Sequence, residues 1–288
     1  MSQIEIYRAR AGKEVSAEEA AAATAAAVSQ FEITVRFRGG LTQTQKNAFK
    51  AAADRWSRII VGDLPSVQVD GEIIDDVLIE AQGSDIDGPS GILGQAGPTH
   101  VRPASAGAFA FLPVKGIMAF DKADLASMEQ EGTLGDVITH EMGHVLGIGT
   151  IWDSKGLLQN AGTSNPTFSG AGAMAEFGRL KNTGPTAVPV ENTGGAGTAD
   201  GHWRETVFRN ELMSGFISEP GNPISRMTVA SLEDLGYVVN MEAAEPYELP
   251  NLFELAESGS LTSHIAPINL GVMLPSIPIV LPDESLQP

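Results

Sequence analysis

The stretch ITHEMGHVLGIGTIW, residues 138–152, places two histidines and a glutamate at the spacing HExxH. On a helix this spacing puts His140 and His144 about one turn apart on one face, close enough to share a metal ion. Glu141, between them, faces the same position without binding the metal, and it can take a proton from a water that the metal acidifies. The pattern therefore predicts a catalytic zinc site, which normally takes a third protein ligand.

The surrounding residues predict the helix that this spacing requires. Thr133 and Asp136 are the residue types of an N-cap pair, and Gly147 ends the helix soon after the second histidine. Apolar residues recur on another face, which we expect to pack on a sheet: Leu134, Ile138, Met142 and Val145. The glycine turns the chain, so that a third ligand can arrive from downstream. In the most familiar extended motif a histidine stands three residues after this glycine, but this chain has Thr150 there.

The rest of the chain predicts an α+β protein. Alternation of apolar and polar residues predicts strands at residues 31–37, 75–81 and 114–120. A capping box of Thr42 and Gln45 begins a long helix that ends near Gly62. We expect shorter helices at residues 171–180 and 225–235. Residues 83–108 are rich in Gly, Ser and Pro and are expected to be mostly loop, and residues 148–201 are expected to be largely irregular.

Composition narrows the classes of protein and partner. The chain has 288 residues, of which 42% are hydrophobic and 19% charged, as in a globular protein of one large domain or two small ones. A net charge of -18 repels nucleic acid and anionic membranes, and we discount both as partners. The chain has no cysteine, which excludes disulfides, thiolate zinc sites and cysteine nucleophiles. No stretch approaches the roughly 18 consecutive apolar residues of a transmembrane segment.

Both ends of the chain differ in composition from the middle. Residues 1–30 are expected to be a tail, pro-segment or linker, with an alanine-rich helix at residues 20–28. Charges stand where the apolar part of a secretory leader should be, so no conventional signal peptide is predicted. Beyond residue 240 the chain is acidic, then apolar and proline-rich, and we expect an extended segment that packs on the body.

Three stretches resemble the leishmanolysin family of zinc peptidases. They are HEMGHVLGIGTIW at residues 140–152, GAGTADGHWRETVFRNELMSGFI at residues 195–217, and SRMTVASLEDLGYVVN at residues 225–240. In that family a long insertion follows the helix and displaces the third histidine. The resemblance implies His140, His144 and His202 as zinc ligands, Glu141 as the general base, and Met213 as the methionine beneath the metal.

The resemblance covers residues 31–240 and implies a metzincin-type catalytic domain with a twisted mixed sheet and an active-site helix. Its upper subdomain is expected at residues 31–147 and its smaller lower subdomain at residues 148–240, followed by a C-terminal extension at residues 241–288. The implied activity is zinc-dependent endopeptidase action on extended polypeptide, by a protein that is secreted or at the cell surface. The sequence leaves the oligomeric state and the natural substrate open.

The chain departs from the family's better-known members in two respects. They are rich in disulfides, and a pro-segment cysteine keeps them latent by occupying the zinc; a chain without cysteine can do neither. Gly215 stands where an additional tyrosine ligand would follow the methionine, so we expect no such ligand.

Other functions stay open at this point. One alternative is an inactive zinc-binding homologue that acts in adhesion or recognition; the presence of Glu141 argues against it, because a structural zinc site needs no base. The other is a metal-free structural protein in which the histidines are incidental. His202 could then be a surface histidine beside a buried Trp203. We assign no role to His100 or His264.

Two further sites are predicted. Asp85 and Asp87, with nearby Asp75 and Asp76, could bind calcium in a glycine-rich loop, although aspartates in loops commonly only form turns. By resemblance to metzincins, the strand at residues 114–120 is expected to be the edge strand over the cleft, where an extended peptide can add antiparallel to it. Side-chain preference is expected to depend on a pocket wall near residues 214–223.

Overall fold

A computed structural model describes residues 4–11, 30–86, 88, 93–217, 220–251, 257 and 277–287. Among these residues, no helix is both long enough and apolar enough to cross a membrane. The alanine-rich helix expected at residues 20–28, Asp87 and His264 all lie outside the described residues.

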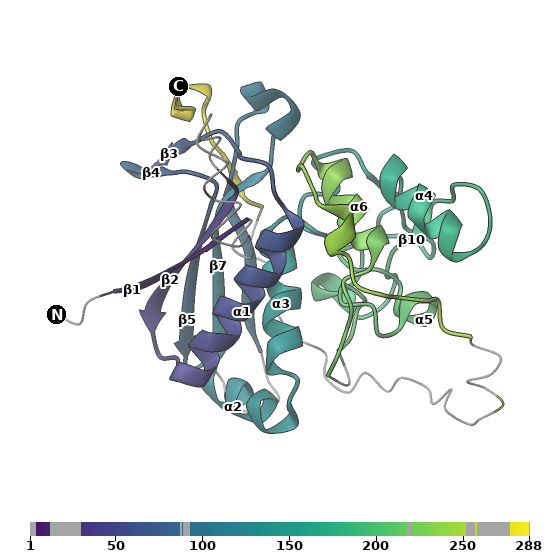
Figure 1. Ribbon diagram of the computed structural model, residues 1–288, viewed down its shortest axis with the longest axis horizontal. Coiled ribbons are helices and arrows are strands. Elements are labelled where there is room, and N and C mark those ends of the chain that lie inside the picture. Colours follow the sequence, from purple (N-terminus) through teal and green to yellow (C-terminus); the bar gives the residue numbers. More distant parts are fainter. Residues whose placement is uncertain are drawn as a thin grey trace, which may run out of the picture.

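A twisted mixed sheet forms one side of the molecule, with strand order β1-β2-β5-β7-β6-β11 (Figure 1). The strands are β1 (Glu5–Arg10), β2 (Glu32–Gly39), β5 (Val77–Ser84), β6 (Gly94–Val101), β7 (Pro113–Asp121) and β11 (Ile279–Val280). Strands β2, β5 and β7 run parallel, and β1 and β6 lie antiparallel to their neighbours β2 and β7. A hairpin of β3 (Val67–Val69) and β4 (Glu72–Ile74) lies beside the sheet. The three strands expected from alternation are β2, β5 and β7, with shifted ends.

The prediction that the strand at residues 114–120 lies at the sheet edge is wrong. This strand, β7, is hydrogen-bonded to β5 on one side and to β6 on the other. Strand β6 falls within the stretch that was expected to be mostly loop. Its glycines and proline dilute the strand pattern, but Gly94 is required there, since a Cβ atom would come within 2.3 Å of the Ala119 carbonyl oxygen. Beyond β7 the sheet therefore continues with the antiparallel strand β6 and then with the short strand β11.

Two long helices cover one face of the sheet, α1 (Gln43–Ile59) and α3 (Leu134–Val145), with α2 (Lys122–Glu131) preceding α3 (Figure 1). The capping box of Thr42 and Gln45 at the start of α1 is confirmed. The Trp56 indole N–H donates to the Thr139 carbonyl at 2.9 Å and so ties α1 to α3. These contacts hold the HExxH helix, α3, at a fixed place over the sheet.

The predicted N-cap pair of α3 does not form. Thr133 is at the N-cap position, but its side chain makes no capping hydrogen bond. Asp136 instead accepts the backbone N–H groups of Gly221 and Asn222, at 2.6 and 3.2 Å, and it lies 3.6 Å from Arg55. The first turn of α3 is therefore joined to a segment 85 residues downstream.

The chain beyond α3 forms a second part of the molecule, residues 146–251, beside the sheet and its helices (Figure 1). It contains α4 (Ala171–Leu180), α5 (Glu205–Phe208) and α6 (Arg226–Leu235) and a small sheet of β8 (Leu158–Gln159), β9 (Thr167–Phe168) and β10 (Val188–Pro189). The helices expected at residues 171–180 and 225–235 are confirmed. Trp152 and Trp203 stack with ring centroids 4.6 Å apart in its core.

Both ends of the chain add strands to the main sheet. Strand β1 lies within the segment expected to be a tail, and it pairs along its whole length with β2. Strand β11, within the proline-rich C-terminal segment, pairs with β6 at His100 and Val101. The nearby Leu281 is buried in a small apolar cluster with β3, so this part of the C-terminal segment packs on the body as expected.

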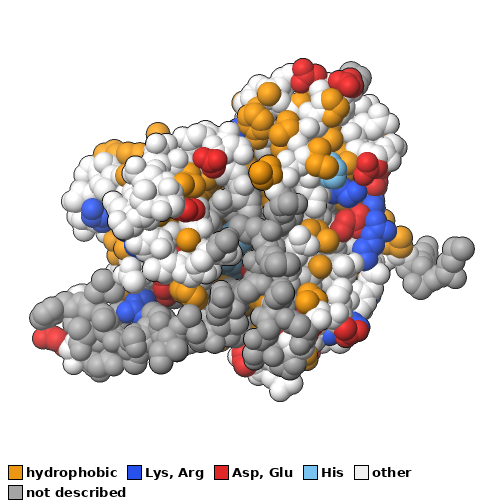
Figure 2. Space-filling view, turned by 180° about the vertical axis from the view of Figure 1, so that it is seen from behind, with side chains coloured by type: hydrophobic (Ala, Val, Ile, Leu, Met, Phe, Trp, Pro, Cys, Tyr) orange, Lys and Arg blue, Asp and Glu red, His pale blue; other side chains and the backbone are white. Residues whose placement is uncertain are grey.

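Charged side chains on the outer sheet surface are arranged in pairs of opposite sign. Arg36 binds Glu72 and Glu80, and Arg38 also binds Glu80. Figure 2 shows such basic and acidic side chains side by side on the sheet-bearing part of the molecule. The basic residues here are therefore neutralised by neighbours rather than gathered into a patch for an anionic polymer.

Candidate metal centre

The imidazoles of His140, His144 and His202 converge on one point. Their Nε2 atoms lie 3.0 Å apart between His140 and His144, 3.1 Å between His140 and His202, and 2.9 Å between His144 and His202. Zinc–nitrogen bonds of about 2.0–2.1 Å in a tetrahedral site separate ligand nitrogens by about 3.3 Å. The triangle formed by these three atoms is close to one face of that tetrahedron.

Backbone carbonyls fix the orientation of each ring. The Nδ1 atoms of His140, His144 and His202 lie 2.6, 2.8 and 2.8 Å from the carbonyl oxygens of Leu212, Ile148 and Thr198. Each Nδ1 must carry its proton to donate to a carbonyl, so each Nε2 presents a lone pair to the centre. Three lone pairs at this distance repel one another unless a cation lies between them. The donor set therefore fits a divalent metal that prefers imidazole.

The rings are fully enclosed. Burial, followed by the charge of a neighbouring imidazole, lowers the pKa of all three histidines to about 3. They are consequently neutral at physiological pH, which is the form that binds metals. The alternative of a surface histidine at position 202 is not what the structure shows, since His202 is 4% exposed.

Glu141 is the other ionisable group on this turn of α3. Its side chain is 1% exposed, and its Oε2 atom has no hydrogen-bond partner among the described residues. Burial raises the pKa of Glu141 to about 8. A buried carboxyl oxygen without a partner costs free energy, and it suits a group that exchanges protons with a reacting molecule.

Close backbone contacts bring His202 to the helix. Gly149, just after α3, has a φ of +76°, and a Cβ atom on it would lie 2.0 Å from the carbonyl oxygen of Gly201. Only glycine allows the turn after the helix to touch the residue that precedes His202. Thr150 does not face the metal centre: its hydroxyl donates to the His144 carbonyl at 2.7 Å and caps the end of the helix.

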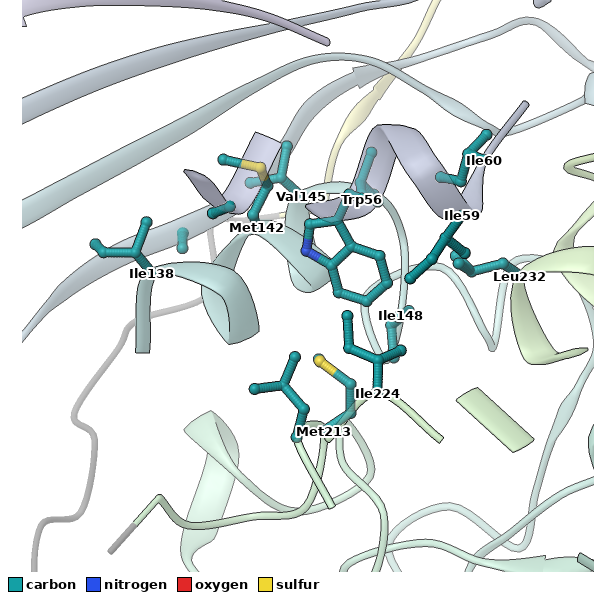
Figure 3. Close-up of a cluster of buried hydrophobic side chains, with 14 of the residues drawn as sticks. Trp56, Ile59, Ile60, Ile138, Met142, Val145, Ile148, Met213, Ile224 and Leu232 are labelled. Carbon is teal, nitrogen blue, oxygen red and sulfur yellow. The ribbon is translucent and has the colours of Figure 1, made fainter. Parts of the chain in front are cut away.

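Met213 is fully buried and packs against Gly143 of α3. A Cβ atom on Gly143, the glycine inside HExxH, would come within 2.8 Å of the Met213 sulfur and 3.0 Å of the Trp56 ring. Figure 3 shows the Met213 side chain directed toward Trp56, within the apolar cluster that joins the two parts of the molecule. The absence of a side chain at Gly143 thus makes room for the methionine.

We expect Gly143→Ala to destabilise the protein by about 2 kcal/mol or more, because the added methyl group must displace Met213 or Trp56 in a packed core. Gly135→Ala is the matched control on the same helix, since its Cβ atom would meet no atom within 4 Å. That control should stabilise by about 0.5–1 kcal/mol. Urea denaturation of both metal-free variants measures the difference, and equal stabilities would contradict the packing.

Glu211, which sequence reasoning did not single out, lies in the turn whose Leu212 carbonyl contacts His140. Its carboxylate is fully buried and accepts the Met213 backbone N–H at 2.7 Å, together with Ser225 and Thr228 of the α6 N-terminus. Burial raises the pKa of Glu211, and these hydrogen bonds act in the opposite direction. Its only sequence signal was its place directly before Leu212 and Met213, in the stretch of residues 195–217 that resembles leishmanolysin.

Of the aspartates proposed as a calcium site, Asp85 is not brought together with Asp75 and Asp76, and Asp87 lies outside the described residues. Asp76 precedes β5 and Asp85 follows it, so a strand of about 26 Å separates them. Asp85 pairs with Lys122 at 2.9 Å. Asp76 lies near Asp63 and Asp75, but its two oxygens already accept the backbone N–H groups of Glu32 and Leu64. Calcium is therefore unsupported.

His100 lies on β6, apart from the three converging histidines, and its ring contacts Thr99.

Comparison with known proteins agrees with the resemblance. Residues 109–251 match the family model described as leishmanolysin. The matched segment contains α3, the three converging histidines, Glu141 and Met213. A search of curated proteins found no match to this chain.

Proposed function

Because the chain is leishmanolysin-like over residues 109–251, we propose that the protein is a zinc-dependent endopeptidase. The observation that carries this proposal is the convergence of three imidazoles whose Nε2 atoms lie within 3.1 Å of one another, beside a buried carboxyl group. The Nδ1 atom of each imidazole contacts a backbone carbonyl. Three histidine ligands leave a fourth position open, as in catalytic rather than structural zinc sites.

We assign the metal to the Nε2 atoms of His140, His144 and His202. Zinc, when bound, would lower the pKa of a water and polarise the carbonyl of the peptide bond to be cut. The carbonyl oxygens of Leu212, Ile148 and Thr198 hold the imidazoles in the tautomer that this requires. Met213 and Trp56 pack against Gly143 of α3.

Glu141 moves the proton in this proposal. It receives a proton from the attacking water and passes it to the leaving nitrogen of the cleaved peptide bond. Both transfers need a carboxylate whose pKa lies near the working pH. In the metal-free protein, burial without a charged partner raises the pKa of Glu141 to about 8, and a cation bound beside it would lower that pKa again, toward the range in which the carboxylate accepts a proton. The Oε2 atom of Glu141 has no hydrogen-bond partner among the described residues, and we assign the proton to this atom.

The substrate is proposed to be an extended polypeptide that lies along β6. This strand takes the place that the sequence had assigned to β7. Its pairing with β11 begins only at His100, so among the described residues Gly94 to Pro98 face no further strand. A strand edge without a further strand offers backbone N–H and C=O groups to a peptide.

We further propose the metzincin arrangement, with residues 31–147 above the cleft and residues 148–240 below it. Residues 214–217 and 220–223 then contribute to the wall that selects a substrate side chain; residues 218 and 219, also part of that expectation, lie outside the described residues. Leishmanolysin-like chemistry suits a protein that is secreted or at the cell surface, and we propose that location.

The proposal is tested by removing and restoring the metal. Protein stripped with a chelator should cut none of a pool of unstructured peptides, and one equivalent of zinc should restore cleavage, read by mass spectrometry. Zinc at about 1,000 times its Kd should also raise the Tm by on the order of 10 °C, since binding to the folded state adds about 4 kcal/mol.

Two other outcomes would redirect the proposal. Tight zinc binding without any cleavage favours the second candidate function, a zinc-binding homologue that acts in recognition. No zinc binding and no shift in Tm would reject both functions, because the three histidines would then have no metal to hold.

A further inference from the structure

The tripeptide Glu211–Leu212–Met213 lies between two of the three histidines. The Leu212 carbonyl accepts the His140 Nδ1–H at 2.6 Å, and this bond sets the plane of the His140 ring. The Met213 carbonyl accepts the backbone N–H of Trp203, the residue after His202, at 2.9 Å. One short turn thus orients a ligand from α3 and a ligand from the distant loop.

The shape of this turn depends on the Glu211 side chain. Its Oε2 atom accepts the Met213 N–H at 2.7 Å, which closes the turn on itself. Its Oε1 atom accepts the backbone N–H of Ser225 at 3.0 Å, the Ser225 hydroxyl at 2.7 Å, and the Thr228 hydroxyl. A carboxylate that bridges two elements in this way prevents either from shifting alone.

The partners of Glu211 at the other end belong to the start of α6. Ser225 is the N-cap of α6, and a helix N-terminus attracts a negative charge. The Thr228 hydroxyl also accepts the Trp203 indole N–H at 2.8 Å, which gives a second connection toward His202. Figure 3 shows Met213 near Ile224, which lies just before α6. Leu232 of α6 belongs to the same apolar cluster.

We propose that Glu211 is a positioning residue for the metal centre: its buried carboxylate anchors the turn to α6 and thereby sets the orientation of His140 and His202. This inference rests on the proposed function, because it concerns ligands of the proposed zinc. Glu211 touches neither metal nor substrate, and it acts through Leu212 and Met213.

Glu211→Gln tests this role, because it removes the carboxylate while it keeps the size of the side chain nearly unchanged. The amide oxygen can take the place of Oε1, where three donors converge, and the amide NH₂ then faces the Met213 N–H. Two donors cannot bond each other, so the turn loses the contact that closes it. Loss of an outer group that orients a metal ligand typically weakens metal affinity by about 10- to 100-fold.

Asp234→Asn is the matched control. Asp234 also accepts two backbone N–H groups at a helix N-terminus, those of Gly172 and Ala173 of α4, at 2.8 and 2.9 Å. The amide would again place a donor against a donor. No described hydrogen bond links Asp234 to the histidines, so a merely structural loss should leave the metal centre unchanged.

The experiment measures the zinc Kd of the full chain by competition with a chromogenic chelator, for the wild type and both variants. It also records the visible spectrum of the cobalt-loaded proteins. We expect Glu211→Gln to weaken zinc binding about 10- to 100-fold and to change the cobalt spectrum, and Asp234→Asn to stay within about two-fold of the wild type with the same spectrum.

An unchanged Kd and spectrum in folded Glu211→Gln would overturn the inference, as would an equal loss in both variants. If Glu211→Gln does not fold, Thr228→Val decides, because it removes one bond to Glu211 and the acceptor of the Trp203 indole. Weaker zinc binding by Thr228→Val than by Asp234→Asn supports the inference, and equal binding rejects it. A wild type that binds no zinc would reject the proposed function itself.

Discussion

Replacing Glu141 with glutamine is expected to lower kcat/KM by about 10²- to 10⁴-fold while zinc remains bound, because the amide cannot accept the proton that the proposed mechanism assigns to Glu141. The side chain keeps its shape, and none of the three imidazoles uses Glu141 as a partner. Zinc content, measured in the same preparation, should therefore equal that of the wild type. Residual cleavage near the wild-type rate would show that another group acts as the base.

The stability of the metal-free protein gives an independent check on Glu141. Burial raises its pKa to about 8 in the folded state, against 4.5 ordinarily. Between these pH values the folded protein holds a proton on Glu141 that the unfolded chain has lost, so the contribution of Glu141 to stability falls as pH rises from about 5 to 8. Glu141→Gln has no such proton, so the stability of the wild type relative to this variant should fall over this range in urea denaturation. An identical pH dependence in both proteins would contradict the burial of a titrating carboxyl group.

Replacing His202 with alanine is expected to weaken zinc binding by about 10²- to 10³-fold and to abolish cleavage. A complete zinc site is worth about 10–16 kcal/mol, so one of four ligand positions accounts for roughly 3–4 kcal/mol. His140 and His144 would remain on α3 as a pair, which holds zinc weakly and without a fixed geometry. Competition with a chromogenic chelator measures the affinity.

His100→Ala is the control for this loss. His100 lies on β6 and contacts Thr99, outside the cluster of converging histidines, so its removal should leave the zinc Kd unchanged. A drop in affinity of less than about three-fold for His202→Ala would show that the third ligand is a different group. Equal losses in both variants would indicate a general effect on folding instead.

The local part of the fold was predictable because its causes lie within a few residues. The capping box of Thr42 and Gln45 acts over three positions, and the ends of α6 at Ser225 and Gly236 act over one turn. The HExxH spacing is similar, since helix geometry alone brings His140 and His144 together. The resemblance to leishmanolysin supplied His202, which the HExxH spacing alone did not identify.

The failures came from interactions between distant segments. Strand order is not encoded in any one strand, so nothing within β7 revealed that β6 covers its other side. Asp136 was matched with Thr133 from its spacing, but backbone N–H groups 85 residues away are stronger partners. The sequence did not indicate that Glu211 is buried, because a glutamate is ordinarily exposed and only the docking of α6 against the turn buries this one.

The sequence by itself determined a helix with two histidines and a glutamate on one turn, because a helix is built from contacts of three and four residues. Tertiary structure alone decided how the third imidazole arrives 58 residues later and how its ring is held. That step needs Gly149 to touch Gly201, Met213 to fit against Gly143, and the Glu211 carboxylate to bind α6. These are contacts between surfaces that exist only once the chain has closed on itself.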